Sequence, residues 1–476
     1  MLYDKDNKLK ERTLKDIDKN KVVFKESFTY DSLERLKEEN ILNDVKSILK
    51  YSYKYGKNEK TGDSINHINK VRINDSEYNY IYDLKGNIAE VNSEAGKNIY
   101  KYDLMGQLIK EENLGRNSVA EFKYDTGGNI LNKNIVTESG EKDIVYLYDD
   151  IWKDKLVSYD GKKIEYDQIG NPLSFDGATF TWESGRNLTK YIKDDLSVEY
   201  KYNKDGIRYS ENVNGIETRY SLNSNKEVSG MNFNDKNIIF DRDSKGRLVS
   251  LRTEDEIFYY KLNLFSDVEA LLDSEGNEVI KCTYDSWGKI ISIEGSEKEK
   301  LEKLNPFKYR SYFFDNETGF YYLQSRYYNP EINRFINMDD RLIENGNVYS
   351  YCNNNPIVMV DYDGHLGHYM CGWAYPTRPS EVALVERRWK QYVSADAVNK
   401  YGTKLVNMYR NDFSKPRTYY FSTGSITVRG VFTETIPQYK IEISPIPITL
   451  GAILNVPFSP IIDLITGVGL GAAMKN

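Results

Sequence analysis

The chain is poor in the residues that build disulfides, metal sites and leader sequences. Its 476 residues include three cysteines and three histidines, and their spacing matches neither a disulfide framework nor a zinc site. The first residues, MLYDKDNKLKERTLKD, are charged and lack the apolar segment of a signal peptide. We therefore expect no metal, no cofactor and no signal peptide, so that the chain is exported by another route or is a piece of a longer protein.

The net charge is distributed unevenly along the chain. The formal net charge is -7, but residues 366–476 contain 12 Lys and Arg against 7 Asp and Glu. That tail is therefore +5 and the remainder is -12. An acidic body with a basic tail indicates different partners for the two parts, although this excess is also typical of an ordinary solvated surface.

Tyrosine, by contrast, is abundant, with 40 residues, and much of it belongs to a repeat. Segments such as YNYIYDLKGNI from Tyr78 and IYKYDLMGQLI from Ile99 share a Tyr-Asp pair followed by Gly. Successive aspartates of these pairs are 18 to 24 residues apart, which predicts a repeat with loops of variable length. They are Asp83, Asp103, Asp125, Asp149 and Asp167.

Each repeat unit has the pattern of a β-hairpin. Aromatic and polar residues alternate before the aspartate, as in a strand with one apolar face. The carboxylate can accept hydrogen bonds from nearby backbone N–H groups, and Gly adopts the positive φ that a residue with a Cβ resists. Repetition extends one sheet, which must curl or close to protect its edges. The pattern alone leaves a closed shell and an open solenoid with exposed tyrosine ladders as alternatives.

Helical spacing occurs at two places. In DSLERLKEENILNDVKSILKY, from Asp31, apolar residues lie three or four positions apart, which predicts an amphipathic helix with strands on either side. SEVALVERRWKQYVSADAVNKYGTKLVNMY, from Ser380, predicts one or two further helices. RTYYFSTGSITVRGVFTE and YKIEIS, which follow, predict strands of a small sheet.

The segment from Asn305 to Gly364 begins NPFKYRSYFFDNETGFYYLQSRYYNPEINRFINMDD and ends NVYSYCNNNPIVMVDYDG. With the Tyr-Asp units before it, this segment resembles the Rhs or YD-repeat proteins, a family that includes the WapA proteins, the C components of Tc toxins and the teneurins. The resemblance implies a mostly β fold, in which a YD-repeat β-hairpin shell, wound as a cocoon-like spiral sheet, is closed by an Rhs core plug. A small α+β C-terminal domain would follow.

The resemblance also divides the chain. We expect residues 1–60 to be an N-terminal repeat remnant or partial shell and 61–304 to be the YD-repeat shell. Residues 305–365 would be the Rhs-associated core, and residues 366–476 a variable, effector-like domain.

In members of the family that process themselves, the core is an aspartyl protease that cuts directly after itself. The family patterns, approximately GRFLSPDP and NPxxxxDPxGL, correspond here to NRFINMDD and NPIVMVDYDGH. The resemblance thus assigns Arg334 and Asp339 to the first pattern, Asp361 to the second, and the cut to the bond after His365. Two neighbouring carboxyl groups share a proton, so one can activate water while the other donates to the carbonyl oxygen. Arg334 would bias the ionisation of this pair or hold the segment in place.

This sequence departs from the family patterns at three positions. Asp340 and Tyr362 replace the prolines that follow the two aspartates, and His365 replaces the leucine before the cut. The two aspartates therefore have two interpretations, a catalytic pair or residues that cap turns. Asp340 and Asp363 are competing candidates for the pair.

The segment Arg326-Tyr327-Tyr328 matches the family equally well. We interpret these three residues as structural, because arginine can pair with a carboxylate or stack on tyrosine rings. No catalytic role is assigned to them.

The end of the chain is apolar. Asp463 is the one charged residue between Glu442 and Lys475, but four prolines interrupt this stretch. Insertion into a membrane as a Gly-rich hairpin is one interpretation, and packing in the small domain or against the inner wall of the shell is the one we favour. The basic balance would suit a nuclease, but no nuclease metal pattern accompanies it.

The resemblance implies the function of a polymorphic toxin in competition between bacteria. The shell would encapsulate its own C-terminal domain as cargo, release it by self-cleavage, and be matched by a cognate immunity protein. Such a protein is secreted or associated with the cell surface. The alternatives are an adhesion or carbohydrate-contact module, which predicts tyrosines that face outward, and a fragment of a larger Rhs or WapA protein.

Overall fold

The computed structural model describes residues 1–4, 8–16, 20–57, 64–339, 347–365, 367–369, 417–421, 424–433 and 436–443. Strands dominate, as the resemblance implies, and 28 of them belong to one sheet. Each of these strands pairs antiparallel with the next along the chain, from β1 with β2 to β27 with β28.

The first half of the sheet consists of β1 (Leu2–Tyr3), β2 (Leu9–Asp16), β3 (Lys21–Tyr30), β4 (Leu36–Leu42), β5 (Ser47–Lys57), β6 (Ser64–Ile73), β7 (Ser76–Tyr82), β8 (Ile88–Ser93), β9 (Gly96–Tyr102), β10 (Leu108–Asn113), β11 (Ser118–Tyr124), β12 (Ile130–Thr137) and β13 (Gly140–Tyr148). The second half consists of β14 (Leu156–Tyr159), β15 (Lys162–Tyr166), β16 (Pro172–Phe175), β17 (Ala178–Glu183), β18 (Asn187–Lys193), β19 (Leu196–Tyr202), β20 (Arg208–Val213), β21 (Ile216–Leu222), β22 (Val228–Phe233), β23 (Lys236–Arg242), β24 (Leu248–Arg252), β25 (Ile257–Leu262), β26 (Val268–Leu272), β27 (Glu278–Tyr284) and β28 (Ile290–Glu294).

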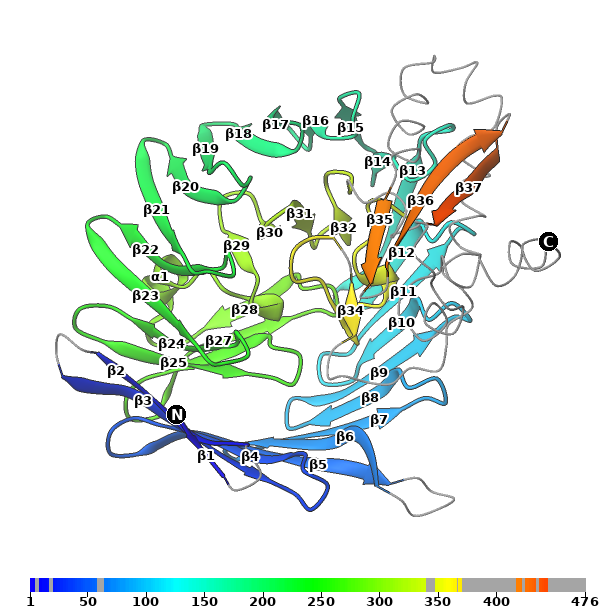
Figure 1. Cartoon of the computed structure of the whole chain (residues 1–476). Helices are drawn as coiled ribbons and strands as arrows, with labels where there is room; N and C mark the ends of the chain where they lie inside the picture. The colour runs from blue at the N-terminus through cyan, green and yellow to red at the C-terminus, as the bar shows by residue number, and fades with distance from the viewer. Residues whose placement is uncertain are drawn as a thin grey trace.

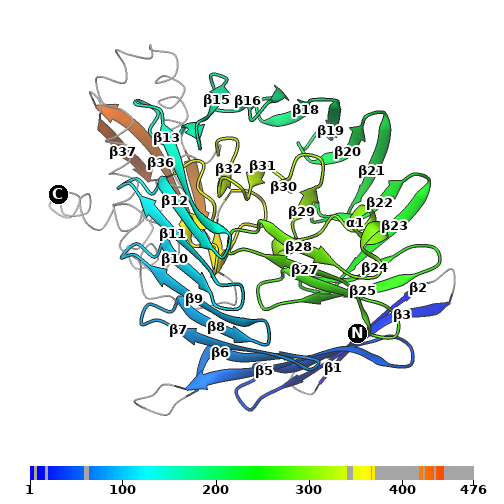
Figure 2. The ribbon, with the colours of Figure 1, turned by 180° about the vertical axis from the view of Figure 1, so that it is seen from behind.

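The sheet winds into a spiral. In Figure 1 it passes from β2–β6 at the bottom up one side through β7–β13, across the top through β14–β19 and down the other side through β20–β28. Figure 2 shows the same course from behind. The last strands thereby return to the first, and the Tyr259 hydroxyl donates a hydrogen bond to the Val23 carbonyl at 3.0 Å across this seam. The Leu262 N–H donates to the Tyr51 hydroxyl at 3.1 Å, so side chains join the two ends of the spiral.

The repeat turns share one construction, which Asp83 illustrates. Its Oδ1 accepts hydrogen bonds from the backbone N–H groups of Lys85 and Asn87, both at 2.8 Å, and Gly86 has a φ of +82°. The same pair of bonds, to the second and fourth residues that follow, is made by Asp103, Asp125, Asp167, Asp243, Asp273 and Asp285. The turn predicted from the Asp and Gly spacing is confirmed at these positions, whereas Asp149, which no Gly follows, accepts from the N–H groups of Ile151 and Trp152.

The tyrosine at the end of several of these strands ties its hairpin to an earlier strand. The Tyr82 hydroxyl donates to the Ile68 carbonyl at 2.5 Å, and the Tyr102 hydroxyl donates to the Ile88 carbonyl at 2.7 Å. Equivalent bonds are made by Tyr124, Tyr148, Tyr202 and Tyr284. Tyrosines two positions earlier in such strands are buried, namely Tyr80, Tyr100, Tyr146 and Tyr200. The tyrosine rows are therefore core, contrary to the outward orientation that the adhesion alternative predicts.

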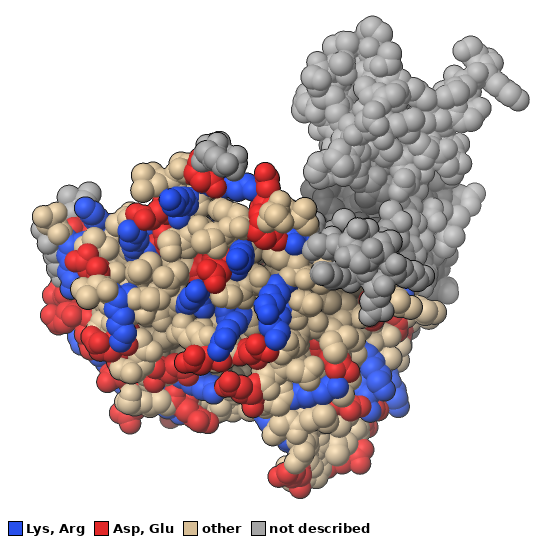
Figure 3. Space-filling view, turned by 90° about the horizontal axis from the view of Figure 1, so that it is seen from below, with Lys and Arg blue, Asp and Glu red and all other residues tan. Residues whose placement is uncertain are grey.

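The other face of the strands is polar. Figure 3 shows Lys and Arg interspersed with Asp and Glu over the outer surface of the sheet. Neighbouring strands contribute pairs such as Lys190 Nζ with Glu199 Oε1, 2.7 Å apart. Exposed pairs of this kind contribute little to stability, so the buried face dominates the energetics of the sheet.

The helix predicted from Asp31 is wrong. This segment forms the end of a turn and then β4 and β5, and Asp31 Oδ1 accepts hydrogen bonds from the N–H groups of Leu33 and Arg35. Ile41 and Ile48 point into the core from two adjacent strands. The spacing of these apolar residues also fits one face of a helix. The segment forms a strand because β4 pairs with the edge of β3.

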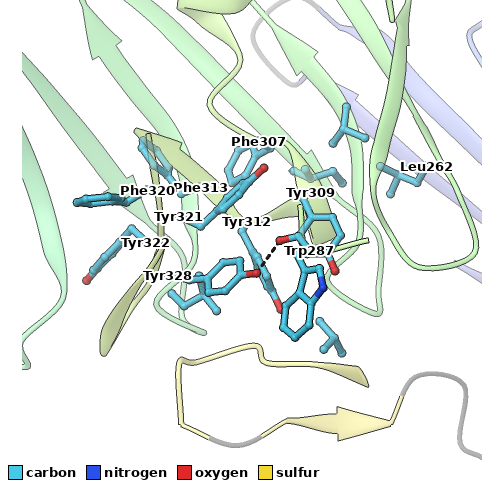
Figure 4. Packing of buried hydrophobic residues seen from close by; sticks show 14 of the residues in the cluster. Leu262, Trp287, Phe307, Tyr309, Tyr312, Phe313, Phe320, Tyr321, Tyr322 and Tyr328 are labelled. Carbon is cyan, nitrogen blue, oxygen red and sulfur yellow. Dashed lines mark hydrogen bonds between the residues drawn. The ribbon is translucent and has the colours of Figure 1, made fainter. Parts of the chain in front are cut away.

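The described residues 298–339 and 347–365, which we call the plug, lie inside the spiral (Figure 1). They form α1 (Lys298–Leu304), the 3-10 turns η1 (Tyr309–Ser311) and η2 (Cys352–Asn354), β29 (Phe313–Asp315), β30 (Phe320–Leu323), β31 (Arg326–Asn329), β32 (Arg334–Phe335) and β33 (Met359–Val360). Plug and shell share one hydrophobic core, part of which is drawn in Figure 4. Within it Tyr328 stacks on Tyr351 at 4.2 Å and donates its hydroxyl to the Trp287 carbonyl of the shell at 2.6 Å.

Beyond the plug, β34 (His368–Tyr369) pairs with β33. β35 (Arg417–Phe421), β36 (Gly424–Thr433) and β37 (Ile436–Ile443) form an antiparallel sheet, where the sequence predicts strands. The helices predicted from Ser380 and the apolar tail lie outside the described residues. Within the described part of the chain, no helix has the length and apolar character needed to cross a membrane.

Candidate active site in the plug

Arg326, on β31, is the centre of a buried group of charges. It is 2% exposed, and its guanidinium lies over the Phe335 ring, 3.5 Å from the ring centroid. Its Nη2 is 3.2 Å from Asp339 Oδ2 and 3.5 Å from Asp361 Oδ2. Both carboxyl groups are also buried. One guanidinium therefore joins the two aspartates that the family patterns assign.

Arg326 also holds the backbone at the expected cut. Its Nε donates to the Gly364 carbonyl, and its Nη2 donates to the His365 carbonyl at 3.2 Å. The His365 carbonyl belongs to the peptide bond that joins residues 365 and 366. A cationic donor on this oxygen polarises the carbonyl and stabilises negative charge that develops there.

Asp361 shapes the turn that presents this peptide bond. Its Oδ1 accepts hydrogen bonds from the N–H groups of Gly364 at 2.9 Å and His365 at 3.1 Å. Its own N–H donates to the Tyr312 hydroxyl at 2.8 Å. Gly364 has a φ of +78°, and a Cβ there would lie 2.7 Å from Ser325 Oγ. The turn therefore requires glycine at the position where the family pattern has it.

The two aspartates have different surroundings. Burial raises the pKa of the Asp361 carboxyl, Arg326 opposes this, and the carboxylates of Asp363 and Asp339 raise the pKa further. Asp339 has the shorter distance to Arg326, and its Oδ1 lies 3.1 Å from His365 Nδ1. Two carboxyl groups with different surroundings can divide the roles of acid and base.

Arg334 lies with a different set of partners. Its guanidinium donates to the Tyr148 hydroxyl at 2.9 Å, the Asp154 carbonyl at 2.8 Å and Asn347 Oδ1 at 3.2 Å. The first two belong to the shell, so Arg334 fastens the plug to the repeat turns. Of the two roles expected for Arg334, these contacts match that of holding the segment, and Arg326 takes the position beside the aspartates.

Asp340 and Asp363 are the competing candidates for the catalytic pair, and the structure describes Asp363. Asp340 lies outside the described residues. Asp363 Oδ1 accepts a hydrogen bond from the His365 N–H at 3.1 Å, and its backbone carbonyl accepts one from Ser325 Oγ at 2.6 Å. Asp363 thus supports the turn beside the peptide bond.

The residue that sequence reasoning undervalued is Arg326. Of the two roles expected for it, pairing with a carboxylate is confirmed, and the ring under its guanidinium is that of Phe335 instead of a tyrosine. Arg326 also contacts the carboxylate of Asp361, 35 positions along the chain, and the His365 carbonyl. Both contacts form because β31 packs against the end of the plug. No local pattern carries that information.

The fold and the site define a shell of Tyr-Asp hairpins closed by a plug that contains a buried Arg-Asp-Asp group. A family model described as the teneurin YD-shell matches residues 92–357. This match covers more than half of the chain, and the chain belongs to that family.

The similar proteins include two WapA nucleases and a deaminase toxin. The chain is 34% identical over 279 residues to the tRNA3(Ser)-specific nuclease WapA of Bacillus spizizenii, and 33% identical over 279 residues to the tRNA nuclease WapA of Bacillus subtilis. Each match covers 56% of this chain and 12% of the relative, so the chain spans a small part of those proteins. A match to the double-stranded DNA deaminase toxin A of Burkholderia cenocepacia, 24% identical, covers 62% of this chain and 23% of that toxin.

Solved structures share the fold. A crystal structure of TcdB2-TccC3-TEV superposes with a TM-score of 0.61 at 21% identity, over 76% of this chain and 20% of that chain. TcdB2-TccC3 without its hypervariable C-terminal region gives a TM-score of 0.59 at 20% identity, over the same shares of the two chains. The protein is therefore an Rhs or YD-shell protein, similar in sequence to the WapA proteins and in fold to the TccC3 structures.

Proposed function

We propose that this protein cuts its own chain between His365 and Leu366 and so releases residues 366–476. The observation that carries the proposal is the position of Arg326. Its Nη2 contacts Asp339, Asp361 and the carbonyl oxygen of His365 at 3.2 to 3.5 Å. An acid, a base and a donor to the reacting oxygen are the groups that hydrolysis of a peptide bond requires.

In the proposed reaction a water molecule adds to the carbonyl carbon of His365. Asp339 accepts a proton from the water, and Arg326 stabilises the negative charge on the carbonyl oxygen. Asp361, whose raised pKa favours the protonated carboxyl, donates its proton to the leaving nitrogen. The C–N bond to Leu366 breaks, which leaves a carboxyl group on His365 and an amine on Leu366. Asp339 keeps the proton taken from the water.

Three features of the site support a reaction at this bond. The aspartates and the arginine are buried, so charges there interact strongly. The turn from Asp361 to His365 is fixed by hydrogen bonds to Asp361 and to Ser325. The His365 ring lies toward Asp339, and the His365 carbonyl oxygen accepts a hydrogen bond from Arg326.

A panel of variants of the full chain tests the proposal. The parent should yield a 111-residue fragment on denaturing gels, and Asp339→Asn, Asp361→Asn and Arg326→Ala should leave the chain intact. Arg334→Lys is the matched control, because Arg334 is equally buried in the plug and contacts neutral oxygens. Its fragment should persist. Cleavage that survives in Arg326→Ala and disappears in Arg334→Lys would reverse the roles of the two arginines.

We also propose that the released piece, residues 366–476, acts as an effector in competition between bacteria. The names of the WapA and deaminase relatives support this, and a producing cell would then need a cognate immunity protein. Secretion or attachment to the cell surface belongs to the same proposal. Expression of residues 366–476 in a bacterial host should arrest growth. Unimpaired growth at a high level of soluble fragment would favour the adhesion alternative with an inert tail.

Enclosure of this effector needs more room than the plug-filled part of the shell contains. A cavity of about 700 Å³ lies between the plug and the seam, lined by residues such as Tyr53, Arg247 and Phe313. At roughly 120 Å³ per residue, from a helix about 10 Å wide that rises 1.5 Å per residue, this space holds about six residues. The 111-residue piece does not fit in this cavity, so its encapsulation is proposed for a shell longer than the one described.

A further inference from the structure

A buried lysine of the shell meets a buried asparagine of the plug. Lys133 on β12 is 4% exposed, and Asn333, between β31 and β32, is 0% exposed. Lys133 Nζ lies 3.1 Å from Asn333 Oδ1, and within the described residues this is the one hydrogen bond that the amine makes. The two residues are 200 positions apart in the chain. Their contact therefore joins the wall of the spiral to the plug inside it.

The side-chain carbonyl group of Asn333 is polarised and fixed. The Tyr146 hydroxyl donates a second hydrogen bond to Asn333 Oδ1, at 3.2 Å. Asn333 Nδ2 donates to the Pro330 carbonyl at 3.2 Å, so both ends of the amide are held. If a nucleophile added to Cγ, negative charge would develop on Oδ1, where Tyr146 already provides a donor.

The surroundings of Lys133 favour a neutral amine, which is a nucleophile. Burial lowers the pKa of the Lys133 ammonium group, and the carboxylates of Asp285 and Glu331 oppose this. Within the described residues no carboxylate forms an ion pair with Lys133, whereas the buried Lys261 has its Nζ 2.6 Å from Glu278 Oε1. A desolvated lysine without a paired charge gives up its proton readily, and its amine can then attack a carbonyl carbon.

We propose that Lys133 and Asn333 form an isopeptide bond, an amide between their side chains that fastens the shell covalently to the plug. Cγ of Asn333 is one bond, about 1.2 Å, from the oxygen that Nζ contacts, so the reacting atoms are neighbours. This bond is independent of the self-cleavage proposed for the plug.

The reaction needs no oxidant and no cofactor. The Nζ–Cγ bond forms, the Cγ–Nδ2 bond breaks, and one proton passes from Nζ to Nδ2, so that ammonia leaves. Asp285 carries this proton, because burial raises the pKa of its carboxyl group and so makes it a proton acceptor in this place.

A covalent link here would do what disulfides do in other proteins. Cys282 and Cys352 are buried and free. A bond that closes a long loop of the chain restricts the unfolded state, and so favours the folded one. The proposed bond closes such a loop between the shell and the plug.

The test is the mass of the parent protein under denaturing conditions. It can be read on the uncut chain or on residues 1–365, because both contain Lys133 and Asn333. Loss of one ammonia should leave this mass about 17 Da below that of the sequence. After digestion with trypsin, residues 124–142 and 327–334 should appear as one branched peptide. This peptide is sought in the parent, so the result does not depend on the folding of any variant.

Two variants of asparagine make the test specific. Asn333→Gly removes the reacting amide, and glycine suits the φ of +57° at this position, so the mass deficit should disappear. Asn117→Gly is the matched control, because Asn117 has a φ of +47° in an exposed turn. Its mass deficit should remain.

A third variant tests the transfer of the proton. Asp285→Asn removes the carboxyl group but keeps the turn, since three asparagines of other repeats make the same two hydrogen bonds as Asp285, namely Asn203, Asn223 and Asn263. The unlinked mass should predominate in this variant, and a fully linked chain would overturn the role of Asp285.

Three outcomes would overturn the isopeptide bond. One is a parent with the full mass of its sequence. Another is a mass deficit that persists in Asn333→Gly. The third is a deficit of one ammonia with the two tryptic peptides separate, which would indicate a cyclic imide of asparagine.

Discussion

Arg326 differs from two other buried arginines, Arg208 of the shell and Arg334 of the plug, in the groups that it holds. Arg208 forms a bidentate pair with one carboxylate, that of Asp315, and Arg334 contacts neutral oxygens. Arg326 meets two carboxylates and the three backbone carbonyls of Val348, Gly364 and His365. Its removal would leave two carboxyl groups facing each other in a buried place, and one of them would then hold a proton more tightly. The arginine therefore sets the charge state of the pair as well as the position of the peptide bond.

Glu111 gives a test of buried charge that does not depend on the plug. Burial, followed by the charge of Asp285, raises its pKa from 4.5 to about 7. The folded chain thus holds this proton more tightly than the unfolded chain, and stability present below pH 4.5 is lost as the pH rises through 7. The loss from this one group is about 3 kcal/mol, at about 1.4 kcal/mol per pH unit.

Glu111→Gln should therefore match the parent in urea unfolding at about pH 4.5 and be more stable than it by about 2 to 3 kcal/mol at about pH 9. Glu121→Gln, on the exposed face of β11, is the control and should leave the pH dependence unchanged. A parent and a Glu111→Gln variant with parallel pH profiles would show that Glu111 titrates alike in the folded and unfolded chain.

At the scale of elements, the hairpin was the most predictable part of this protein. Asp83 and Gly86 specify a turn through contacts within five residues, so the sequence contains all of its chemistry. The segment from Asp31 was mispredicted because its apolar spacing suits two structures, and pairing with β3 decides between them. The plug was the least predictable part of this protein. The contacts of Arg326 join β31 to the end of the plug, and only the folded chain brings them together.

Two glycines of equal φ give a prediction for the turns. Gly170 and Gly185 have φ of +83° and +88°, and alanine at either position is strained by roughly 1 kcal/mol or more. A Cβ at Gly185 would meet nothing within 4 Å, whereas one at Gly170 would clash with the Tyr349 hydroxyl and lie 2.8 Å from the Trp152 ring. Gly170→Ala should cost about 1 to 3 kcal/mol more than Gly185→Ala in urea unfolding. Equal losses would mean that plug and turn are not packed as closely as described.

At the scale of the whole molecule, the shell and the plug depend on each other. The spiral sheet closes through side chains across its seam, and its interior is filled by the aromatic residues of the plug (Figure 4). A shell without its plug would expose that core, so we expect the two to unfold together. A buried ion pair joins Arg208 on β20 of the shell to Asp315 on β29 of the plug. Both of its Nη–Oδ distances are 2.7 Å.

Asp315→Asn should destabilise shell and plug together by about 3 to 5 kcal/mol, because it leaves the Arg208 guanidinium buried without its counter-charge. Urea unfolding monitored by tryptophan fluorescence measures this. Asp176→Asn is the control, since Asp176 pairs with Lys162 at the exposed surface, and its cost should stay within about 1 kcal/mol. A loss in Asp315→Asn as small as that of the control would argue against a buried ion pair between plug and shell.

The most direct test of the account is the intact mass of the purified full chain under denaturing conditions, beside that of Asp361→Asn. The account predicts that the parent gives two masses, those of residues 1–365 and of a 111-residue piece that begins at Leu366. Asp361→Asn should give one mass, that of 476 residues. An uncut parent, or a cut at the same bond in Asp361→Asn, would contradict the assignment of the Arg-Asp-Asp group as the site that cleaves the chain.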